Sequence, residues 1–260
     1  MNILVLVKQV PNTTEMKINK EHGTLMRQGV ESIINPDDLA SVEFALTIKD
    51  EQPDTHVRVI SMGPPQAKSM LTDLYGLGVD DCVLISDPSF SGADTWATSN
   101  TLAAAISRYP FDLILAGRQA IDGDTAQVGP QVAQRLGIPQ ITYVKQIESV
   151  TSTHVTVSKH YEDYIELSRC KYPCLLTCLS EGTSPRLGRI EYIWRSLDQP
   201  ITVLSNQQLQ LDPSRIGLKG SYTKVKRTFV RPIETKGQMI VQDIELAAKT
   251  IADILKKAAS

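Results

Sequence analysis

The stretch AGRQAIDGDTAQVGPQ, residues 116–131, decides the fold because it joins a short apolar run to a helical segment. The apolar run, residues 111–115, has the length of a buried strand, and the segment that follows predicts a helix ending at Gly137. Between them lies a polar turn made of Asp122, Gly123, Asp124 and Thr125. Gly123 is free to take a positive φ there. A strand, a polar turn and a helix start point backbone N–H groups and the helix dipole at one place, so we expect an anion-binding, nucleotide-holding loop.

Strands and helices alternate on the N-terminal side of this loop. Continuous apolar runs predict strands at residues 2–8, 57–61, 82–86 and 112–117, with helices at 39–51, 66–78 and 95–109 between them. Such runs are typical of parallel strands that helices cover on both faces. The pattern predicts an α/β fold with an open, doubly wound, mainly parallel sheet of the Rossmann-like, adenine-nucleotide-binding type. Ligands of these sheets bind beyond the carboxyl ends of the strands.

The chain changes character after Gly137. Residues 141–149, 153–160 and 163–169 alternate apolar and polar side chains, which predicts an antiparallel hairpin extension. One more buried strand is predicted at 172–179 and a helix at 184–196. Earlier, residues 11–34 show no sustained period and predict a surface excursion with a small hairpin at 21–24.

The C-terminal part is predicted to be an arm that lies on another protein. Residues 205–239 are basic and rich in proline and glycine, and so long a structureless stretch is unusual inside a compact domain. A helix at 240–257 follows, with Ile244, Ala247, Ile251 and Ile254 on one stripe. We therefore divide the chain into a nucleotide-binding domain, 1–204, and an arm with an amphipathic helix, 205–260. The alternative is that the helix packs back on its own domain.

The composition excludes several functions. The 260 residues are 42% hydrophobic and 22% charged, which is ordinary for a globular protein. A formal net charge of −2 gives no electrostatic case for nucleic acid or an anionic membrane, and no apolar run has the length of a membrane span. The N-terminus lacks the basic region and cleavage site of a signal peptide. We expect a cytoplasmic protein that binds neither nucleic acid nor membrane.

No residue pattern predicts a metal site or side-chain catalysis. Cys170, Cys174 and Cys178 have a C-x3-C-x3-C spacing, but the last two lie in an apolar run where cysteine acts as a small hydrophobe, and no fourth ligand follows. Signatures of dinucleotide-binding, Walker A and hydrolase-elbow loops are missing. The remaining residues that could bind a metal or act in catalysis are one cysteine, expected to be buried, and four histidines, expected to lie on the surface: Cys82, His22, His56, His154 and His160.

Several motifs resemble the β subunit of electron-transferring flavoproteins over nearly the whole chain. They are LVKQVP (6–11), INPDD (34–38), SMGPPQA (61–67), GADTWATS (92–99) and the opening stretch, 116–131. The resemblance implies a heterodimer with an α subunit that carries FAD, and a pocket in this chain that holds AMP in simple shuttles or FAD in electron-bifurcating members. The cofactor-binding residues would be Leu6, Asn35, Asp38, Met62, Gly63, Asp94, Thr95, Thr98, Gly117, Gln119, Asp122, Asp124, Thr125, Ala126, Gln127, Val128, Gly129, Pro130 and Gln131. Gly117 would let the chain pass close to the ring system.

The resemblance favours the bifurcating branch. The start of the helix at Asp94, with Thr95 and Thr98, offers a second phosphate anchor, and FAD has two phosphates whereas AMP has one. In simple shuttles a leucine for dehydrogenase docking follows the strand at 172–179, but Gly182 stands at that place and only Arg186 of the motif remains. The hypothesis is a subunit whose FAD accepts hydride from NADH and divides the electrons between ferredoxin and the α-subunit FAD, which then feeds a flavin-dependent dehydrogenase or reductase. The alternatives are a shuttle subunit with structural AMP and a stand-alone ATP-binding α/β module.

Overall fold

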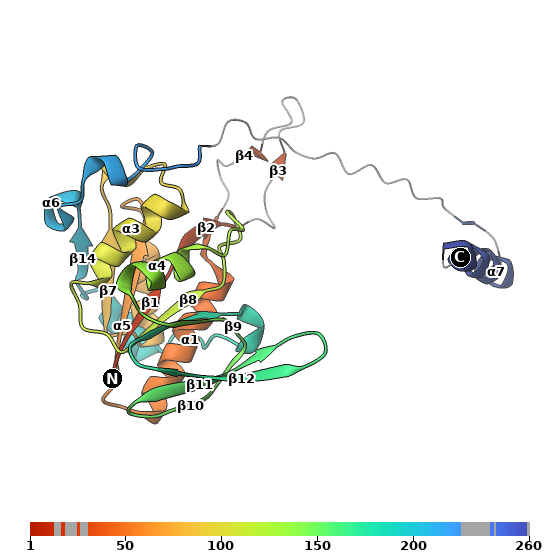
Figure 1. The fold of residues 1–260 in the computed structure, drawn as a ribbon, viewed down its shortest axis with the longest axis horizontal. Helices are drawn as coiled ribbons and strands as arrows, with labels where there is room; N and C mark the ends of the chain where they lie inside the picture. The colour runs from red at the N-terminus through yellow and green to blue at the C-terminus, as the bar shows by residue number, and fades with distance from the viewer. Residues whose placement is uncertain (13–16, 19–24, 27–30, 225–239, 242, 259–260) are drawn as a thin grey trace.

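The computed structural model describes residues 1–12, 17–18, 25–26, 31–224, 240–241 and 243–258 (Figure 1). A seven-stranded sheet lies at its centre in the order β14-β7-β6-β1-β8-β13-β9, and all neighbouring strands are parallel. The predicted α/β class with an open parallel sheet is therefore confirmed. The strands of this sheet are β1 (Asn2–Leu6), β6 (His56–Met62), β7 (Asp81–Ile85), β8 (Leu113–Gly117), β9 (Gln140–Val144), β13 (Cys174–Cys178) and β14 (Ile201–Leu204).

Helices cover both faces of the sheet, as a doubly wound fold requires. Helices α1 (Pro36–Glu51) and α2 (Ala67–Leu77) pack on one face, and α3 (Thr95–Ile106) and α4 (Val128–Leu136) pack on the other. In β1, Ile3 and Val5 belong to the first core, whereas Leu4 and Leu6 belong to the second. Because alternate residues of a strand point to opposite faces, a continuous apolar run fills both cores.

A separate antiparallel sheet forms the predicted hairpin extension. It consists of β10 (Gln146–Val150), β11 (His154–His160) and β12 (Ile165–Lys171) (Figure 1). The single strand predicted at 141–149 is wrong, because β9 joins the parallel sheet and only β10 belongs to the hairpins. Tyr143, near the end of β9, has a φ of 60°. This left-handed conformation interrupts the extended backbone just before the chain passes from β9 to β10.

Two segments after β13 also differ from the prediction. The helix predicted at 184–196 is reduced to α5 (Ile190–Ser196), since Pro185 and Gly188 disfavour helix and the Arg186 side chain is held by α1. Strand β14 was not predicted. Its four residues follow Pro200 and become a strand only through pairing with β7.

The first half of the predicted arm packs on its own domain. Residues 205–215 contain α6 (Asn206–Leu209) and η4 (Pro213–Arg215), and Ile216 is 1% exposed in the core beneath α3. The prediction of a structureless chain is therefore wrong for this part, while 225–239 lie outside the described residues. The predicted C-terminal helix is present as α7 (Ile244–Ala258), and Ile244, Ile251 and Ile254 on its apolar stripe are exposed.

Short elements complete the fold. Strand β2 (Gln9–Pro11) pairs antiparallel with β5 (Ser32–Ile34), and β3 (Lys17–Ile18) pairs antiparallel with β4 (Leu25–Met26). The predicted hairpin tip at 21–24, between β3 and β4, lies outside the described residues. Single 3-10 turns occur at η2 (Pro88–Phe90) and η3 (Ser180–Gly182). None of the helices in the described parts of the chain has the length and apolarity to cross a membrane.

Candidate nucleotide-binding site

The carboxyl ends of β1 and β8 lie side by side where the winding of the sheet reverses. Strands β6 and β7 lie on one side of β1, and β8 and β13 lie on the other. Leu6, at the end of β1, is paired with Ala116, near the end of β8. Open α/β sheets bind ligands at such a reversal. The predicted nucleotide loop, residues 118–127, leaves β8 at this point and leads into α4.

Side chains hold this loop in one conformation. Lys8 Nζ, which follows β1, lies 2.6 Å from Asp122 Oδ1, and within the loop Gln119 Nε2 donates a hydrogen bond to Asp124 Oδ1. Asp124 and Ala126 have left-handed φ angles of 50° and 54°. Gly123 does not use its freedom to take a positive φ; the loop places a left-handed residue one position later, at Asp124, because Asp tolerates this conformation. The non-glycine left-handed residues cost roughly 1 kcal/mol or more each, so the rest of the structure must hold them.

Two helix starts meet beside the loop. The first turn of α4 has no side-chain cap, which leaves backbone N–H groups free to bind an anion. Thr95 Oγ1, at the start of α3, donates to Gln127 Oε1 at 2.9 Å and brings that helix start next to α4. The start of α3 is different, because Asp94 Oδ1 already accepts the Ala97 N–H and Asp94 Oδ2 accepts the Thr223 N–H. The Asp94 carboxylate therefore caps its own helix and anchors the chain beyond η4.

The first turn of α1 contacts the same loop and strand ends. Asn35 Nδ2 donates to Gln119 O at 2.8 Å, and Asn35 Oδ1 accepts the Ile121 N–H at 3.0 Å. Asp38 accepts the N–H of Lys8 at 2.8 Å and of Gly117 at 2.9 Å, which joins the ends of β1 and β8. Burial raises the pKa of Asp38 to about 7, Asp37 adds to the rise, and the hydrogen bonds from Lys8, Asn35 and Gly117 oppose it.

Two of the three predicted glycines of the site, Gly117 and Gly129, have packing reasons. A Cβ at Gly117 would overlap with the Asp38 carboxylate and would lie 2.8 Å from Asp37 Cβ, so this glycine lets α1 approach β8. The expected role of Gly117, to let the chain approach a ring system, is not needed to explain the glycine. A Cβ at Gly129 would lie 2.7 Å from Thr177 Cγ2, so Gly129 lets α4 pack closely on β13.

The remaining predicted residues border the same region. Met62 ends β6, and the Gly63 N–H donates to Ile85 O at 3.0 Å across to β7. Thr98 lies in the first turn of α3, where its N–H donates to Asp94 O, and Gln131 Oε1 accepts from Ser99 Oγ at 2.9 Å. Thr125 belongs to the loop, and Val128 and Pro130 belong to the first turn of α4.

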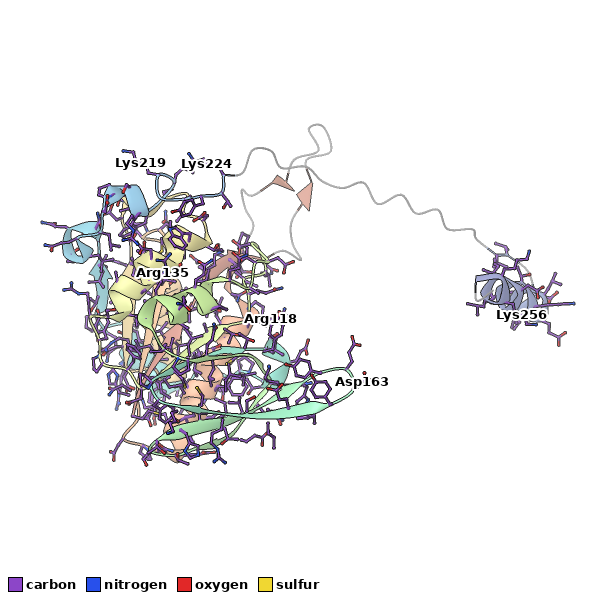
Figure 2. All side chains as sticks on the ribbon, in the orientation of Figure 1. Arg118, Arg135, Asp163, Lys219, Lys224 and Lys256 are labelled. Atoms are coloured by element: carbon purple, nitrogen blue, oxygen red, sulfur yellow. The ribbon has the colours of Figure 1, made fainter. Side chains whose placement is uncertain are left out.

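Several residues of the site were not predicted. Lys8 lies within the LVKQVP motif and Arg118 within the opening stretch, but neither contact follows from sequence. Arg118 Nε lies 3.5 Å from Asp37 Oδ2, and Asp37 Oδ1 accepts the Ser180 N–H at 2.9 Å. Arg135 in α4 donates to Ser99 Oγ and lies 4.1 Å above the Trp96 ring, which ties α3 to α4. Figure 2 labels Arg118 and Arg135 among the side chains of this domain.

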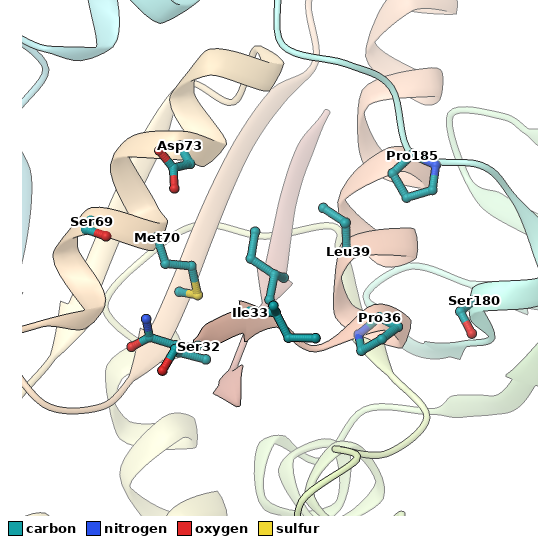
Figure 3. Close-up of a pocket in the computed structure, with 11 residues that line it drawn as sticks. Ser32, Ile33, Pro36, Leu39, Ser69, Met70, Asp73, Ser180 and Pro185 are labelled. Atoms are coloured by element: carbon teal, nitrogen blue, oxygen red, sulfur yellow. The ribbon is translucent and has the colours of Figure 1, made fainter. Parts of the chain in front are cut away.

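A cavity of about 490 Å³ lies elsewhere, between α1, α2, the β2–β5 pair and the chain at 180–185 (Figure 3). Its apolar side chains include Ile33, Leu39 and Met70, and Asp73 is its charged group. Burial raises the pKa of Asp73. The cavity shares no lining residue with the predicted cofactor site, so it is a separate feature.

The cysteines are buried, as predicted for those of the apolar runs. Cys174 and Cys178 lie in β13, and burial raises the pKa of Cys178 and of Cys82 to about 12. Within the described ranges, no three His, Cys, Asp or Glu residues come together as a metal site would require. The histidines predicted at the surface are half-buried at His56, His154 and His160, and His22 lies outside the described residues.

The segment after β13 is fixed against α1. A side chain at Gly182 would overlap with the carbonyl oxygen of Lys145 and would lie 3.0 Å from the Phe44 ring, so this conformation has no space for leucine there. Arg186 is paired with Glu43 at 2.9 Å and with Asp50 at 2.7 Å, both in α1. These acids hold the pKa of Arg186 above its ordinary value, mainly through the hydrogen bond with Glu43.

Comparisons with known proteins agree on one family. The model of the electron transfer flavoprotein domain matches residues 22–201. The electron transfer flavoprotein subunit beta of Clostridium acetobutylicum is 46% identical over 99% of this chain and 98% of that protein. The caffeyl-CoA reductase-Etf complex subunit CarD of Acetobacterium woodii is 47% identical over 99% of both chains. The acryloyl-CoA reductase electron transfer subunit gamma of Anaerotignum propionicum is 42% identical over 92% of both.

Proposed function

Because the chain belongs to the electron transfer flavoprotein β-subunit family, we propose that it pairs with an α subunit that carries FAD and that its own site also holds FAD. In this proposal NADH is the electron donor, and the electrons go to ferredoxin and to the FAD of the α subunit. The uncapped start of α4, set at the reversal of the sheet beside the Thr95 hydroxyl, is the observation that carries the nucleotide site.

The donors around the loop fit a nucleotide phosphate. Free N–H groups in the first turn of α4 and the hydroxyl of Thr125 can each give a charge-assisted hydrogen bond worth roughly 1.5–3 kcal/mol, and the Thr95 hydroxyl can add one only by releasing Gln127 Oε1. Lys8 is already paired with Asp122, so the site relies on neutral donors and the helix dipole. A few such bonds are sufficient to hold a cofactor without a cationic side chain.

The residues of this chain bind and orient the nucleotide, and a flavin would supply the redox chemistry when bound. The left-handed residues Asp124 and Ala126 turn the backbone before α4, and Gly129 brings α4 close to β13. This fixes the direction of the α4 N–H groups before any ligand arrives. The site therefore needs no catalytic side chain from this subunit.

The alternative with a specific observation in its favour is a shuttle subunit with structural AMP. The Asp94 carboxylate caps α3 and holds Thr223. The start of α3 therefore has fewer free donors for a second phosphate than an uncapped helix would have. AMP has one phosphate and requires only the α4 start. Family membership favours either kind of subunit over a stand-alone ATP-binding module.

Cofactor analysis of the purified αβ complex tests the proposal. Two FAD per heterodimer are expected, and titration with NADH in the presence of ferredoxin should reduce ferredoxin and the α-subunit FAD together, one electron of each NADH going to each. One FAD with one AMP would contradict the FAD proposal and support the shuttle. A chain that purifies alone, without flavin and with bound ATP, would support the stand-alone module.

We propose that the partner enzyme is a flavin-dependent reductase or dehydrogenase. Two relatives are named as parts of caffeyl-CoA and acryloyl-CoA reductases, which supports an acyl-CoA substrate class for that partner. Gly182 leaves no room for a docking leucine, which supports a contact of a different kind. The exposed stripe of α7 supports the proposal that residues 225–260 embrace the α subunit.

A further inference from the structure

The side chain of Asn35 forms a bracket across the nucleotide loop. It is fully buried at the start of α1, and its amide group bonds the backbone on both sides of Ala120, through Gln119 O and the Ile121 N–H. Although Asn35 occupies the N-cap position, its side chain makes no capping bond to α1. Its amide group therefore bonds the loop on both sides of Ala120, and the same side chain also gives a hydrogen bond to Asp38 in the first turn of α1.

Asp38 holds the carboxyl ends of β8 and β1, where the nucleotide loop and the chain after β1 begin. Its carboxylate accepts the N–H of Gly117, the last residue of β8, and the N–H of Lys8, two residues beyond β1. Lys8 in turn pairs with Asp122 in the loop. The start of α1 thus holds the loop at Gly117, Gln119 and Ile121, through Asp38 and Asn35. Lys8, just after β1, holds the loop at Asp122.

We propose that Asn35 is a positioning residue for the nucleotide, which acts by holding the backbone of residues 119–121 and not by touching the ligand. The inference rests on the proposed function of the loop. Asp124 and Ala126 adopt unfavourable left-handed conformations just after the bracket, so the free loop needs an external restraint to keep the α4 start accessible. Without Asn35, ordering of the loop must accompany binding and lowers the affinity.

Asn35→Ser is the sharpest test, because serine is as good an N-cap residue as asparagine but is too short to span Gln119 O and Ile121 N. Asn206 offers a matched control. Its side chain also makes two backbone bonds, accepting the Leu211 N–H at 3.0 Å and donating to Leu211 O at 3.1 Å, but it lies in α6. Asn206→Ser therefore removes the same number of side-chain bonds to backbone from a place outside the nucleotide loop.

The measurement is the dissociation constant of the full-length, nucleotide-free chain for AMP and for FAD, by calorimetry. Asn35→Ser is expected to raise the dissociation constant of the nucleotide that the wild type binds by about tenfold or more, because two backbone bonds are lost. The dissociation constant of Asn206→Ser should stay within about twofold of the wild type. Hydrogen exchange should rise in residues 118–127 of Asn35→Ser, with an unfolding midpoint like that of Asn206→Ser. If Asn35 were merely structural, Asn35→Ser would have a lower unfolding midpoint than Asn206→Ser, and the two variants would bind the nucleotide with the same affinity.

Each outcome separates the inference from the proposed function. Affinity of Asn35→Ser within twofold of the wild type would overturn the positioning role and leave the site intact. If the wild type binds neither AMP nor FAD, the proposed function itself fails. If Asn35→Ser does not fold, exchange of the wild-type Ile121 amide decides: protection in the nucleotide-free chain supports the bracket, and free exchange there overturns it.

Discussion

Gly117 and Gly123 lie in the same stretch but have opposite surroundings. A Cβ at Gly117 would overlap with Asp38, whereas a Cβ at Gly123 would meet nothing within 4 Å. Gly117→Ala should therefore lower the free energy of unfolding by about 1–3 kcal/mol through overpacking, and should separate α1 from β8. Gly123→Ala should change it by roughly 0.5 kcal/mol or less. Urea unfolding of both variants checks this, and equal effects would contradict it.

Asp38 gives the domain a pH dependence that an exposed aspartate would not give. Burial raises its pKa from 3.8 to about 7, so the folded chain binds a proton at Asp38 that the unfolded chain releases. The stability from this group is complete below the unfolded pKa and is lost as the pH rises through about 7. Asp38→Asn cannot ionise, so its unfolding free energy should fall less between pH 4 and 7 than that of the wild type.

A second aspartate supplies the control for this pH dependence. Hydrogen bonds from Ser89 and Asn206 lower the pKa of Asp87, so its contribution is present above the unfolded pKa and is lost as the pH falls. Asp87→Asn should therefore flatten the acid side of the curve only. The free energy of unfolding, measured as a function of pH, should change differently in the two variants. Parallel curves for wild type and Asp38→Asn would contradict the raised pKa of Asp38.

At the scale of elements, α1 connects the candidate site with the segment after β13. Its first turn holds the nucleotide loop through Asn35 and the start of η3 through Asp37, and one side of the helix binds Arg186 through Glu43 and Asp50. Glu43 is 8% exposed, so it would be left without its cation if Arg186 were removed. The helix is thus a single rigid support for both regions.

Arg186→Ala should lower the free energy of unfolding by about 2–3 kcal/mol, less than for a fully buried pair because Arg186 keeps some contact with solvent. It should also raise hydrogen exchange in residues 183–189. The control is Arg189→Ala, since Arg189 lies 3.6 Å from Glu191 and both are exposed; its effect should be roughly 0.5 kcal/mol or less. Denaturant unfolding and exchange check both, and equal losses would contradict the role of Glu43.

At the scale of the whole molecule, α7 presents an apolar stripe that no described element covers. Ile251 and Ile254 are 49% and 53% exposed, and Lys249 lies on the opposite side of the helix. Ile251→Asp should leave the unfolding midpoint of the isolated chain unchanged but weaken binding to the α subunit by about tenfold or more, since a buried interface residue is lost. Lys249→Asp should change neither. A lower midpoint for Ile251→Asp would show that α7 packs on its own domain.

The sequence by itself determined the parts of the protein that depend on local pattern. Apolar runs at residues 2–8, 57–61, 82–86 and 112–117 predicted parallel strands because such strands must be apolar on both faces. The strand–loop–helix order around residues 116–131 predicted the nucleotide loop because a helix start carries free N–H groups wherever it lies. The motifs in these same segments pointed to the family.

Only the tertiary structure decided how the polar side chains are used. Asn35, Asp38 and Asp94 stay predicted cofactor-binding residues, and only the fold shows that their side chains bond backbone at Gln119, Lys8 and Thr223. Strand β14 and the packing of Ile216 were likewise invisible, because a short segment becomes regular only when a neighbour pairs with it. Apolar periodicity is a local property of the chain, whereas a hydrogen-bond partner is set by which distant segments the fold brings together.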